Sequence, residues 1–342
     1  MKAIRIHEHG GPENLIYEEI ADPKTAPGEV LVNVKATALN HLDIWVRSGS
    51  TGADYNLPRI PGSDVAGIVS EIGSEVKKVK HGDEVILFPA YFCGECEECK
   101  LGRQTLCDSY APLGTVMDGG DAEYIVVPER NLLPKPENLS FNEAAAFPLV
   151  FLTAWHMLIS LGKVKENDRV LVHGAGSGVG MAAIQIAKQF CARVYTTSSS
   201  DEKLEKAAEI GADFTINYDK ESFQDLIYKD TDGEGVDIVI EHIGPATWKD
   251  SIRSLKKGGR LVTCGATTGP IAELDLRRIF SRQISIHGSY MGYLSELNDV
   301  LRYINSGALK PVVDSVFDLK DAPDAHRHME NRNQFGKIIL NP

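Results

Sequence analysis

The alternation of apolar and polar residues divides the chain into two parts of different texture. Up to about residue 130, short runs of alternating apolar side chains are bounded by Gly, Pro and Asp, which is typical of strands joined by turns. The predicted strands cover residues 2–6, 29–36, 66–72, 83–87 and 122–127. The first part of the chain is therefore predicted to be β-rich.

From about residue 140, short apolar runs alternate with segments whose apolar residues recur at helical spacing. Predicted strands cover 169–173, 193–197, 214–216, 236–241, 259–264 and 284–288, and predicted helices 178–190, 202–210, 223–228 and 247–255. This β-α rhythm predicts an α/β fold with a doubly wound parallel sheet of the Rossmann type. The tail, 294–342, is predicted to hold one long helix followed by short strands that end at 337–340.

Composition and charge narrow the function classes. The 342 residues suffice for two domains, and 43% hydrophobic with 25% charged residues is ordinary globular composition. A net charge of −12, with no Lys/Arg run longer than pairs such as Lys77–Lys78, argues against nucleic acid as a partner. The longest apolar stretch, 144–155, is too short for a membrane span and the first residues alternate like a strand, so we expect no membrane partner, no signal peptide and a cytoplasmic protein.

A glycine-rich turn lies between the first strand and the first helix of the predicted sheet. Small residues let the backbone approach a pyrophosphate, and the positive end of the following helix favours its charge. The candidate cofactor-binding residues here are Gly176, Ser177, Gly178, Val179 and Gly180. A tight βα turn without a ligand is the alternative, but the β-α units that follow favour a nucleotide site.

The next strand ends in hydroxyl residues instead of the carboxylate that usually binds the adenosine ribose of NAD. Ser198 and Ser199, with Lys203 one turn further on, would accept a 2′-phosphate that a carboxylate would repel. The sequence therefore favours NADPH, with NADH still possible. Any of the three serines at 198–200 is also a good N-cap residue for the following helix, and both roles are compatible.

Four of the six cysteines lie in one short lobe, residues 91–108. Cys93, Cys96, Cys99 and Cys107 follow a C-x2-C-x2-C-x7-C spacing. Four thiolates on one loop can close a tetrahedral zinc site with no open position, which is structural and not catalytic. An iron–sulfur centre fits the spacing less well, and two disulfides would form only in an oxidised sample.

The order of these features resembles the medium-chain dehydrogenase/reductase superfamily over essentially the whole chain. The resemblance rests on Gly62 with 64–67, the cysteine lobe, 119–124, 152–154, 178–180, 264–266 and 335–337. It implies a GroES-like catalytic domain made of 1–140 and 290–342, and a Rossmann dinucleotide-binding domain of 141–289. It also implies homodimers or homotetramers that act on a small-molecule substrate.

Departures from the family pattern concern the catalytic zinc. Zinc alcohol dehydrogenases of this family hold that ion with a Cys-His-Cys set, whose positions here are Asn40, Ser63 and a residue within 149–151, none of them a zinc ligand. Without those ligands we expect one structural zinc and no Lewis acid at the reaction centre. Asn40, Asp43 and 152–154 resemble the zinc-independent quinone oxidoreductase and enone reductase branch, which usually lacks the cysteine lobe. His41 beside Asp43 and Asp64 is a weaker alternative for recruiting a metal ion.

The same resemblance assigns further coenzyme contacts. It implies Ser199, Lys203 and Tyr218 around the 2′-phosphate and Lys337 at the cleft. It also places a set of residues near the nicotinamide, namely Thr153, Gly265, Ala266, Gly288, Ser289, Tyr290 and Met291. Purely structural roles are open for several of them: Tyr218 as a surface aromatic, Thr153 as a helix N-cap, Gly265 as a turn glycine and Lys337 as a free surface lysine.

The function expected from these residues is NADPH-dependent hydride transfer to an α,β-unsaturated carbonyl or a quinone. Asn40 is the expected hydrogen-bond donor to the developing oxyanion and Thr153 positions the coenzyme, while His41, Asp43 and Tyr290 are candidate proton donors. The alternative role for Asp43 is to brace the Asn40 loop. Alternatives are an NAD(P)-dependent dehydrogenase of small alcohols or aldehydes, an enoyl-CoA reductase, and a nucleotide-binding protein without turnover. The substrate loops 49–57, 113–120 and 290–297 carry no pattern that identifies the substrate.

Overall fold

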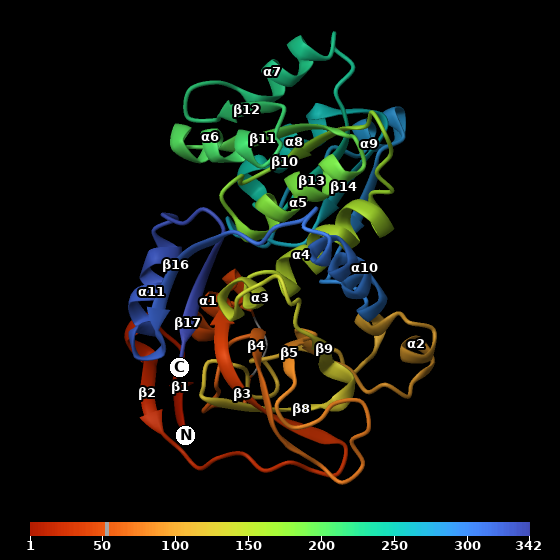
Figure 1. Cartoon of the computed structure of the whole chain (residues 1–342). Helices are drawn as coiled ribbons and strands as arrows, with labels where there is room; N and C mark the ends of the chain where they lie inside the picture. The colour runs from red at the N-terminus through yellow and green to blue at the C-terminus, as the bar shows by residue number, and fades with distance from the viewer. Residues whose placement is uncertain (52–54) are drawn as a thin grey trace. The chain divides into compact units, whose positions relative to one another are not determined.

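The computed structural model describes residues 1–51 and 55–342, so three residues of the expected substrate loop 49–57 lie outside the described residues. The described residues form two compact units. One joins Met1–Leu149 with Leu297–Pro342, and the other comprises Val150–Glu296. Each unit is built around its own sheet (Figure 1). The domain boundaries expected from the sequence, at residues 140 and 290, stay a prediction.

The first unit contains a seven-stranded sheet with the order β16-β17-β3-β4-β5-β9, in which β8 also pairs with β3. Val30, Val32 and Val34 alternate along β3, so they share one face and enter a common core with Val65 and Val69 of β4. The strands of this unit are β1 (Lys2–Ile6), β2 (Leu15–Glu19), β3 (Glu29–Ala38), β4 (Asp64–Ile72), β5 (Glu84–Leu87), β6 (Ala90–Tyr91), β7 (Ala111–Pro112), β8 (Tyr124–Pro128), β9 (Leu132–Pro134), β16 (Val313–Asp318) and β17 (Lys337–Asn341).

Helices are few in the first unit and sit mostly at strand ends. The helices that lie wholly in this unit are α1 (His41–Ser48), α2 (Glu97–Lys100), α3 (Phe141–Ala145) and α11 (Ala322–Glu330). Two further helices, α4 (Pro148–Trp155) and α10 (Leu294–Asn305), each cross a boundary between the two units. The tail therefore contains a second helix, α11, and the expectation of a single helix there was wrong.

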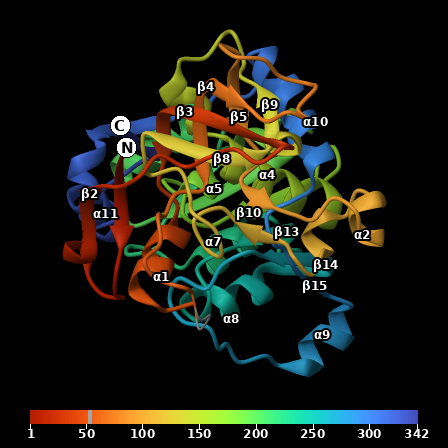
Figure 2. The same cartoon turned by 90° about the horizontal axis from the view of Figure 1, so that it is seen from below.

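The second unit is a six-stranded sheet in which every neighbouring pair runs parallel. The strand order is β12-β11-β10-β13-β14-β15. From β10 the chain first adds β11 and β12 on one side and then β13, β14 and β15 on the other, which confirms the predicted doubly wound sheet (Figures 1 and 2). The strands are β10 (Arg169–Val172), β11 (Arg193–Ser198), β12 (Phe214–Asn217), β13 (Val236–Glu241), β14 (Leu255–Thr263) and β15 (Ser285–Gly288). The helices are α5 (Gly178–Gln189), α6 (Asp201–Glu209), α7 (Phe223–Asp230), α8 (Pro245–Ser254) and α9 (Leu276–Arg282), with a π-helix at His156–Leu161.

Close packing of α5 against β10 explains a glycine in the predicted turn. A Cβ atom on Gly180 would lie 2.2 Å from the carbonyl oxygen of Gly174, so any side chain there would force the helix away from the strand. Gly174 itself has φ +63°, in the left-handed region that favours glycine. The apolar residues of β10, β11 and β13 fill the core beneath, among them Leu171, Tyr195 and Val239. Among the described helices, none is both long and apolar enough to cross a bilayer.

A buried charged cluster ties α1 to α11 in the first unit. The side chain of Arg47 is 2% exposed and contacts Nδ1 of His326 at 3.1 Å, the carboxylate of Glu330 and the carbonyl oxygen of Gly10. Burial, and then the neighbouring charge of Arg47, lower the pKa of His326 to about 3. His326 is therefore neutral in the folded protein at every pH above that value.

We predict that His326 makes the protein less stable in mild acid. Its folded pKa lies below its unfolded value, so the unfolded chain binds the extra proton, and stability is lost as pH falls through about 6.5 toward 3. This residue alone should lower the free energy of unfolding by about 2 kcal/mol between pH 7.5 and pH 5. His326→Gln can still accept a hydrogen bond from Arg47 but does not titrate, so urea unfolding should show a correspondingly flatter pH dependence for this variant. His81→Gln, at an exposed site, is the control. Parallel pH profiles for wild type and His326→Gln would contradict the assignment.

Candidate functional site

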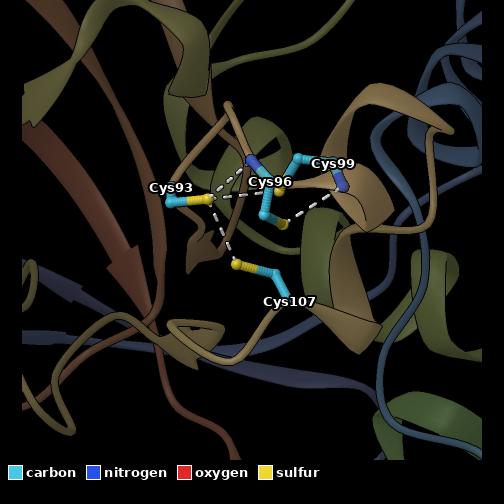
Figure 3. Close-up of side chains that lie close together, drawn as sticks. All are labelled: Cys93, Cys96, Cys99 and Cys107. Atoms are coloured by element: carbon cyan, nitrogen blue, oxygen red, sulfur yellow. Dashed lines mark hydrogen bonds between the residues drawn. The ribbon is translucent and has the colours of Figure 1, made fainter.

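The four cysteines of the lobe converge on one point in the first unit (Figure 3). Their sulfur atoms all lie within 4.8 Å of one another, with 3.8 Å between Cys93 and Cys99 and 3.6 Å between Cys93 and Cys107. A tetrahedral zinc with bonds of about 2.3 Å requires sulfur–sulfur separations of about 3.8 Å. All six cysteines of the chain are free thiols, so the lobe contains no disulfide.

Backbone N–H groups prepare the lobe for a cation. Cys93 Sγ accepts hydrogen bonds from the N–H of Glu95 and of Cys96, and Cys96 Sγ accepts one from the N–H of Cys99. These backbone bonds, that from Glu95 first, lower the pKa of Cys93 to about 6. The donor set and its spacing fit a closed structural zinc held by all four sulfurs.

A second polar cluster forms where β3 passes into α1. Asn40 is the N-cap of α1, and its backbone N–H donates to Oδ2 of Asp43 at 2.7 Å, completing a capping box. The other oxygen of Asp43 accepts the N–H of Gly62 at 3.3 Å. Asp43 therefore holds the Asn40 segment against the segment that leads into β4.

Asp64 and Lys337 complete this cluster, which we call the Asn40 cluster (Asn40, Asp43, Asp64 and Lys337). Lys337 Nζ donates to Oδ1 of Asn40 at 2.6 Å and to Oδ2 of Asp64 at 3.0 Å. The amide of Asn40 donates to the same Asp64 oxygen at 2.9 Å and to the carbonyl of Ala38 at 3.3 Å. Asp64 is 0% exposed and Lys337 2% exposed, so this is a buried ion pair, and a free surface role for Lys337 is wrong.

Two of the three positions at which related enzymes hold a catalytic zinc contact Asp64. Asn40 contacts its carboxylate, and the backbone N–H of Leu149 donates to its other oxygen at 2.8 Å. Ser63 is turned away, since its hydroxyl donates to the carbonyl of Leu113 at 2.7 Å. One carboxylate, already neutralised by an ammonium, and one amide oxygen make a poor donor set for zinc, and the residues do not fit a catalytic metal ion.

Burial perturbs two further carboxylates in this region. Burial, opposed by the N–H of Asn40 and the charge of Lys337, raises the pKa of Asp43 to about 6. Burial and the charge of Asp43 raise the pKa of Asp121 to about 8, and Thr37 donates to one of its oxygens at 2.9 Å. Asp121 is therefore largely protonated at neutral pH, whereas Asp43 is largely ionised and shares the positive charge of Lys337 with Asp64.

His41 is oriented differently from its neighbour Asn40. Its ring packs edge-on against Trp45, with 5.1 Å between ring centroids. Burial and then the charge of Arg332 lower its pKa, while Glu330 opposes them. These neighbours do not make His41 part of the Asn40 cluster, and its role as a proton donor stays a prediction.

The predicted phosphate-binding turn lies in the second unit, where β10 leads into α5. Ser177 is the N-cap of α5 and accepts the N–H of Gly180 at 2.9 Å. Nε2 of His242 lies 2.8 Å from the carbonyl oxygen of His173 and 3.4 Å from Oγ of Ser177. The turn is thus a helix N-terminus with small residues, and His242 contacts it from the end of β13, which fits a pyrophosphate.

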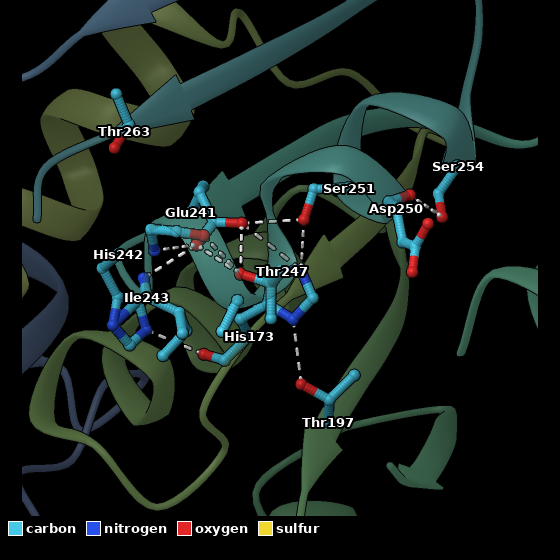
Figure 4. Close-up of polar contacts among 12 residues, drawn as sticks. His173, Thr197, Glu241, His242, Ile243, Thr247, Asp250, Ser251, Ser254 and Thr263 are labelled. Carbon is cyan, nitrogen blue, oxygen red and sulfur yellow. Dashed lines mark hydrogen bonds and ion pairs between the residues drawn. The ribbon is translucent and has the colours of Figure 1, made fainter. Parts of the chain in front are cut away.

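A buried polar network supports this turn from below (Figure 4). Glu241, at the end of β13, accepts hydrogen bonds from Thr247 and Ser251 and from the backbone N–H of Ile243. Ser251 Oγ also lies 2.8 Å from Nε2 of His173. Ser251 donates its proton to Glu241, so its oxygen accepts the hydrogen on Nε2 of His173. Nδ1 of His173 then carries no hydrogen and accepts one from the hydroxyl of Thr197.

Electrostatics keep this network in one protonation state. Burial lowers the pKa of His173, with Glu241 opposing, so the imidazole is neutral. Burial opposes ionisation of Glu241, but the hydrogen bonds that Ser251 and Ile243 donate favour its carboxylate form, and the pKa of Glu241 is lowered. A neutral His173 and an ionised Glu241 therefore fix the end of β10 to α8.

The hydroxyl-rich end of β11 has the composition expected for a 2′-phosphate site. Ser200 is the N-cap of α6 and accepts the backbone N–H of Lys203, as the capping alternative predicted. The carboxylate of Asp201, in the first turn of α6, accepts hydrogen bonds from Nζ of Lys220 at 2.5 Å and from the amide of Asn217 at 2.7 Å. Its negative charge is thus already compensated.

The remaining predicted residues fall at several places in the second unit. Thr153 is buried in the middle of α4, so its alternative as an N-cap was wrong. Tyr218 is 45% exposed just after β12, Gly265 and Ala266 follow β14, and Gly288 with Ser289 ends β15. Contacts of these residues with a coenzyme stay predictions, as do those of Gly176, Gly178 and Val179.

The sequence reasoning did not single out several residues that the structure makes prominent. These are Asp64 as a partner of Asn40, Asp121, His173, Glu241, His242 and Lys220. For Asp64, His173 and Glu241 the signal was a charged residue or histidine at the end of an otherwise apolar strand. Such a residue must find a buried partner.

Removal of the lobe's metal is predicted to lower stability but not the intrinsic chemistry. Cys96→Ala removes one of the four sulfurs that surround the site, and Cys96 is only half-buried, so little core packing is lost with it. A loss of about 2 kcal/mol should lower the Tm by about 4–8 °C, with kcat largely unchanged. Thermal scans with zinc analysis check this, with Cys191→Ser, an exposed thiol outside the lobe, as the control. Unchanged Tm and zinc content in Cys96→Ala would rule out the structural metal.

Comparison with known proteins gives two matches to described families. Residues 26–137 match the alcohol dehydrogenase GroES-like domain, and residues 178–306 match the zinc-binding dehydrogenase family. The first match lies within the first unit, and the second lies mostly within the second unit.

The names of the relatives give different activities. A zinc-type alcohol dehydrogenase-like protein of Schizosaccharomyces pombe is 36% identical over 97% of this chain and 96% of its own length. Human quinone oxidoreductase is 30% identical over 99% of this chain and 97% of its own. A solved structure of an NAD-dependent alcohol dehydrogenase is 44% identical, with a TM-score of 0.97 and complete coverage of both chains. The chain is therefore an enzyme of the medium-chain dehydrogenase/reductase superfamily, whose members use a nicotinamide coenzyme.

Proposed function

We propose that the chain is an NADPH-dependent reductase of α,β-unsaturated carbonyls or quinones that holds one structural zinc and works without a catalytic one. The observation that carries this proposal is the donor set at the zinc-ligand positions. Asn40 is hydrogen-bonded to Lys337 and Asp64, and Ser63 is hydrogen-bonded to Leu113, so neither position offers the thiolate or imidazole that a catalytic zinc needs. When bound, the nicotinamide ring supplies a hydride to an electrophilic carbon. The protein must then stabilise negative charge on the substrate oxygen with its own groups.

Asn40 enters this proposal in a modified role. Both hydrogens of its amide nitrogen already have acceptors, Asp64 and Ala38, so it is not free to donate to a substrate in this arrangement. The ammonium of Lys337 carries three hydrogens, and among the described residues two acceptors take part, Asn40 and Asp64. The cluster thus combines a positive charge with a fixed amide next to it.

The second unit supports the choice of coenzyme through its charges. Lys203 and Lys220 both belong to the hydroxyl-rich edge after β11 and β12, and Lys220 neutralises Asp201. Hydroxyl donors together with a lysine favour a 2′-phosphate. Thr153, Gly265, Ala266, Gly288 and Ser289 are proposed at the nicotinamide. We also propose that the chain acts as a homodimer or homotetramer.

A second candidate function is the oxidation of small alcohols with NAD. It is favoured by the name of the 44% identical solved structure, an NAD-dependent alcohol dehydrogenase. The two candidates differ in metal content, since alcohol oxidation of this type requires a Lewis acid to stabilise the alkoxide.

The direct test measures oxidation of NADPH and NADH against a panel of enones, quinones and aldehydes, and reduction of NADP and NAD by small alcohols. Zinc is counted on the same sample. We expect turnover with an enone or quinone and one zinc per chain, matching the single four-sulfur site of the described residues. Turnover confined to alcohols and aldehydes, with a second zinc per chain, would replace the proposal by the second candidate. Coenzyme binding without turnover of any panel member would instead indicate a nucleotide-binding protein.

Lys203 is predicted to discriminate between the coenzymes. Removing its charge in Lys203→Ala should raise the Kd of NADPH about tenfold, because one charge-assisted bond to a phosphate is lost, and that of NADH less than about twofold. Titration of tryptophan fluorescence measures both constants. Lys206→Ala, on the same helix and paired with Glu202, is the matched control and should leave both unchanged. Equal losses for the two coenzymes in Lys203→Ala would refute the 2′-phosphate assignment.

A further inference from the structure

The segment 289–293 leaves the carboxyl end of β15, at the edge where an open α/β sheet binds its ligands. Its first backbone N–H, that of Ser289, donates to the carbonyl oxygen of Thr263 at 2.8 Å, so the segment starts beside the end of β14. In the sheet, β15 lies three strands away from β10, which is about 14 Å at the usual strand spacing. The segment is therefore well separated from the turn after β10, where the pyrophosphate is proposed to bind.

The backbone of this segment is held in an unusual conformation. Met291 is 6% exposed and has φ +49°, in the left-handed region that residues other than glycine rarely adopt. A Cβ atom on Gly292 would lie 2.7 Å from Cδ1 of Leu152 and 2.7 Å from Oε2 of Glu296, so the backbone packs directly on both side chains. Leu152 precedes Thr153 in α4. Other contacts must hold the segment in this conformation and this close to α4.

The side chain of Glu296 makes those contacts. Its Oε2 accepts the backbone N–H of Tyr293 at 2.6 Å, and both of its oxygens lie 2.9 Å from Nδ1 of His156. The hydroxyl of Ser160 donates to Oε1. Glu296 and His156 are each 5% exposed, and the ring of His156 also packs edge-on against Tyr293, with 4.9 Å between ring centroids. Because a carboxylate only accepts, Nδ1 of His156 carries the hydrogen, and three donors converge on one buried group.

Both side-chain donors belong to the π-helix at His156–Leu161, which continues α4. Its wide turn is closed by the N–H of Gly162, which donates to the carbonyl oxygen of Met157, five residues earlier, at 2.8 Å. Such turns are rare and are found frequently at functional sites. Here the turn carries the donors that reach Glu296, so Glu296 ties the segment 289–293 to the helix that contains Thr153.

We propose that Glu296 and His156 are positioning residues for the nicotinamide end of the coenzyme. Their contact holds the segment 289–293 against α4 and so fixes the spacing of Ser289 and Thr153. This role rests on the proposed function, which assigns both of the latter residues to the nicotinamide site. Glu296 and His156 act through the backbone that they hold and need not touch the coenzyme. Loosening their contact should therefore weaken binding of the nicotinamide and leave the distant adenosine end unaffected.

The test measures the Kd of NADPH and that of 2′-phospho-ADP-ribose, which has every part of this coenzyme except the nicotinamide. In Glu296→Gln an amide nitrogen replaces one oxygen, so the three donors can no longer all be accepted. We expect the Kd of NADPH to rise about tenfold, the effect of about one charge-assisted hydrogen bond, and that of 2′-phospho-ADP-ribose to change less than about twofold. Titration calorimetry measures both constants. Equal changes in the two, or no change in either, would overturn the proposal.

Substitutions of His156 test the same contact from its other partner. His156→Leu removes the donor and should reproduce the selective loss for NADPH. His156→Asn places an amide N–H near the position of Nδ1 and should restore the Kd of NADPH to within about threefold of wild type. A loss as large in His156→Asn as in His156→Leu would overturn the proposal, because the hydrogen bond to Glu296 would then not be its cause.

Glu143→Gln is the matched control for loss of a helix cap. Glu143 accepts the backbone N–H of Ser140, three residues earlier, at 2.9 Å at the start of α3, as Glu296 accepts that of Tyr293 before α10. Both constants should be unchanged in this variant, and a selective loss of NADPH affinity would overturn the proposal.

A milder variant is available if Glu296→Gln does not fold. Ser160→Ala removes one hydroxyl at an exposed position, and the Kd of NADPH should then rise about threefold, again with that of 2′-phospho-ADP-ribose unchanged. An unchanged Kd of NADPH in Ser160→Ala would overturn the proposal in that case.

These constants do not depend on turnover, so failure of the proposed function is recognised separately. If wild type turned over no enone or quinone, the proposed function would fail, and the pair of Kd values would still decide the role of Glu296. If wild type bound NADH and not NADPH, the choice of coenzyme would fail, and NADH with ADP-ribose would decide the role of Glu296 in the same way.

Discussion

Burial of the Asp64 carboxylate is the constraint on which the reaction centre depends. A carboxylate with no exposed surface needs a positive partner, and the sheet register that sets β17 beside β3 supplies one in Lys337. The same ammonium fixes the amide of Asn40. One ion pair thus accounts for the side-chain orientations of the cluster and for its poor fit to zinc, and it links the packing of the tail to the chemistry proposed for the first unit.

The second unit applies a similar principle to coenzyme binding. The pyrophosphate site proposed at the turn after β10 requires small residues, and Gly180 packs directly on Gly174 there. Rigidity has to come from beneath, where an ionised Glu241 and a neutral His173 join the strand ends to α8. The buried polar groups of this unit therefore hold in place the turn at which the pyrophosphate is proposed to bind.

Much of the fold was predictable because buried parallel strands and the helices between them have strong local patterns. The runs at 169–173 and 236–241 and the cysteine spacing each identify their structure without distant partners. Helix α11 was missed because its buried face consists of Ala322, Ala325, His326 and Met329, a weak apolar pattern that Arg47 completes from far away in the chain. Lys337 and Asn40 are 297 residues apart, and their contact is set by strand pairing, which no local pattern encodes.

The central claim is that a protein side chain, and not a metal ion, balances Asp64 at the reaction centre. X-ray diffraction from crystals of the zinc-loaded enzyme, recorded on both sides of the zinc absorption edge, locates every zinc ion directly. We expect an anomalous peak among the sulfurs of Cys93, Cys96, Cys99 and Cys107. Between Asn40 and Asp64 we expect ordinary nitrogen density for Nζ of Lys337. A second anomalous peak bound to Asp64, with Lys337 displaced from it, would contradict the account.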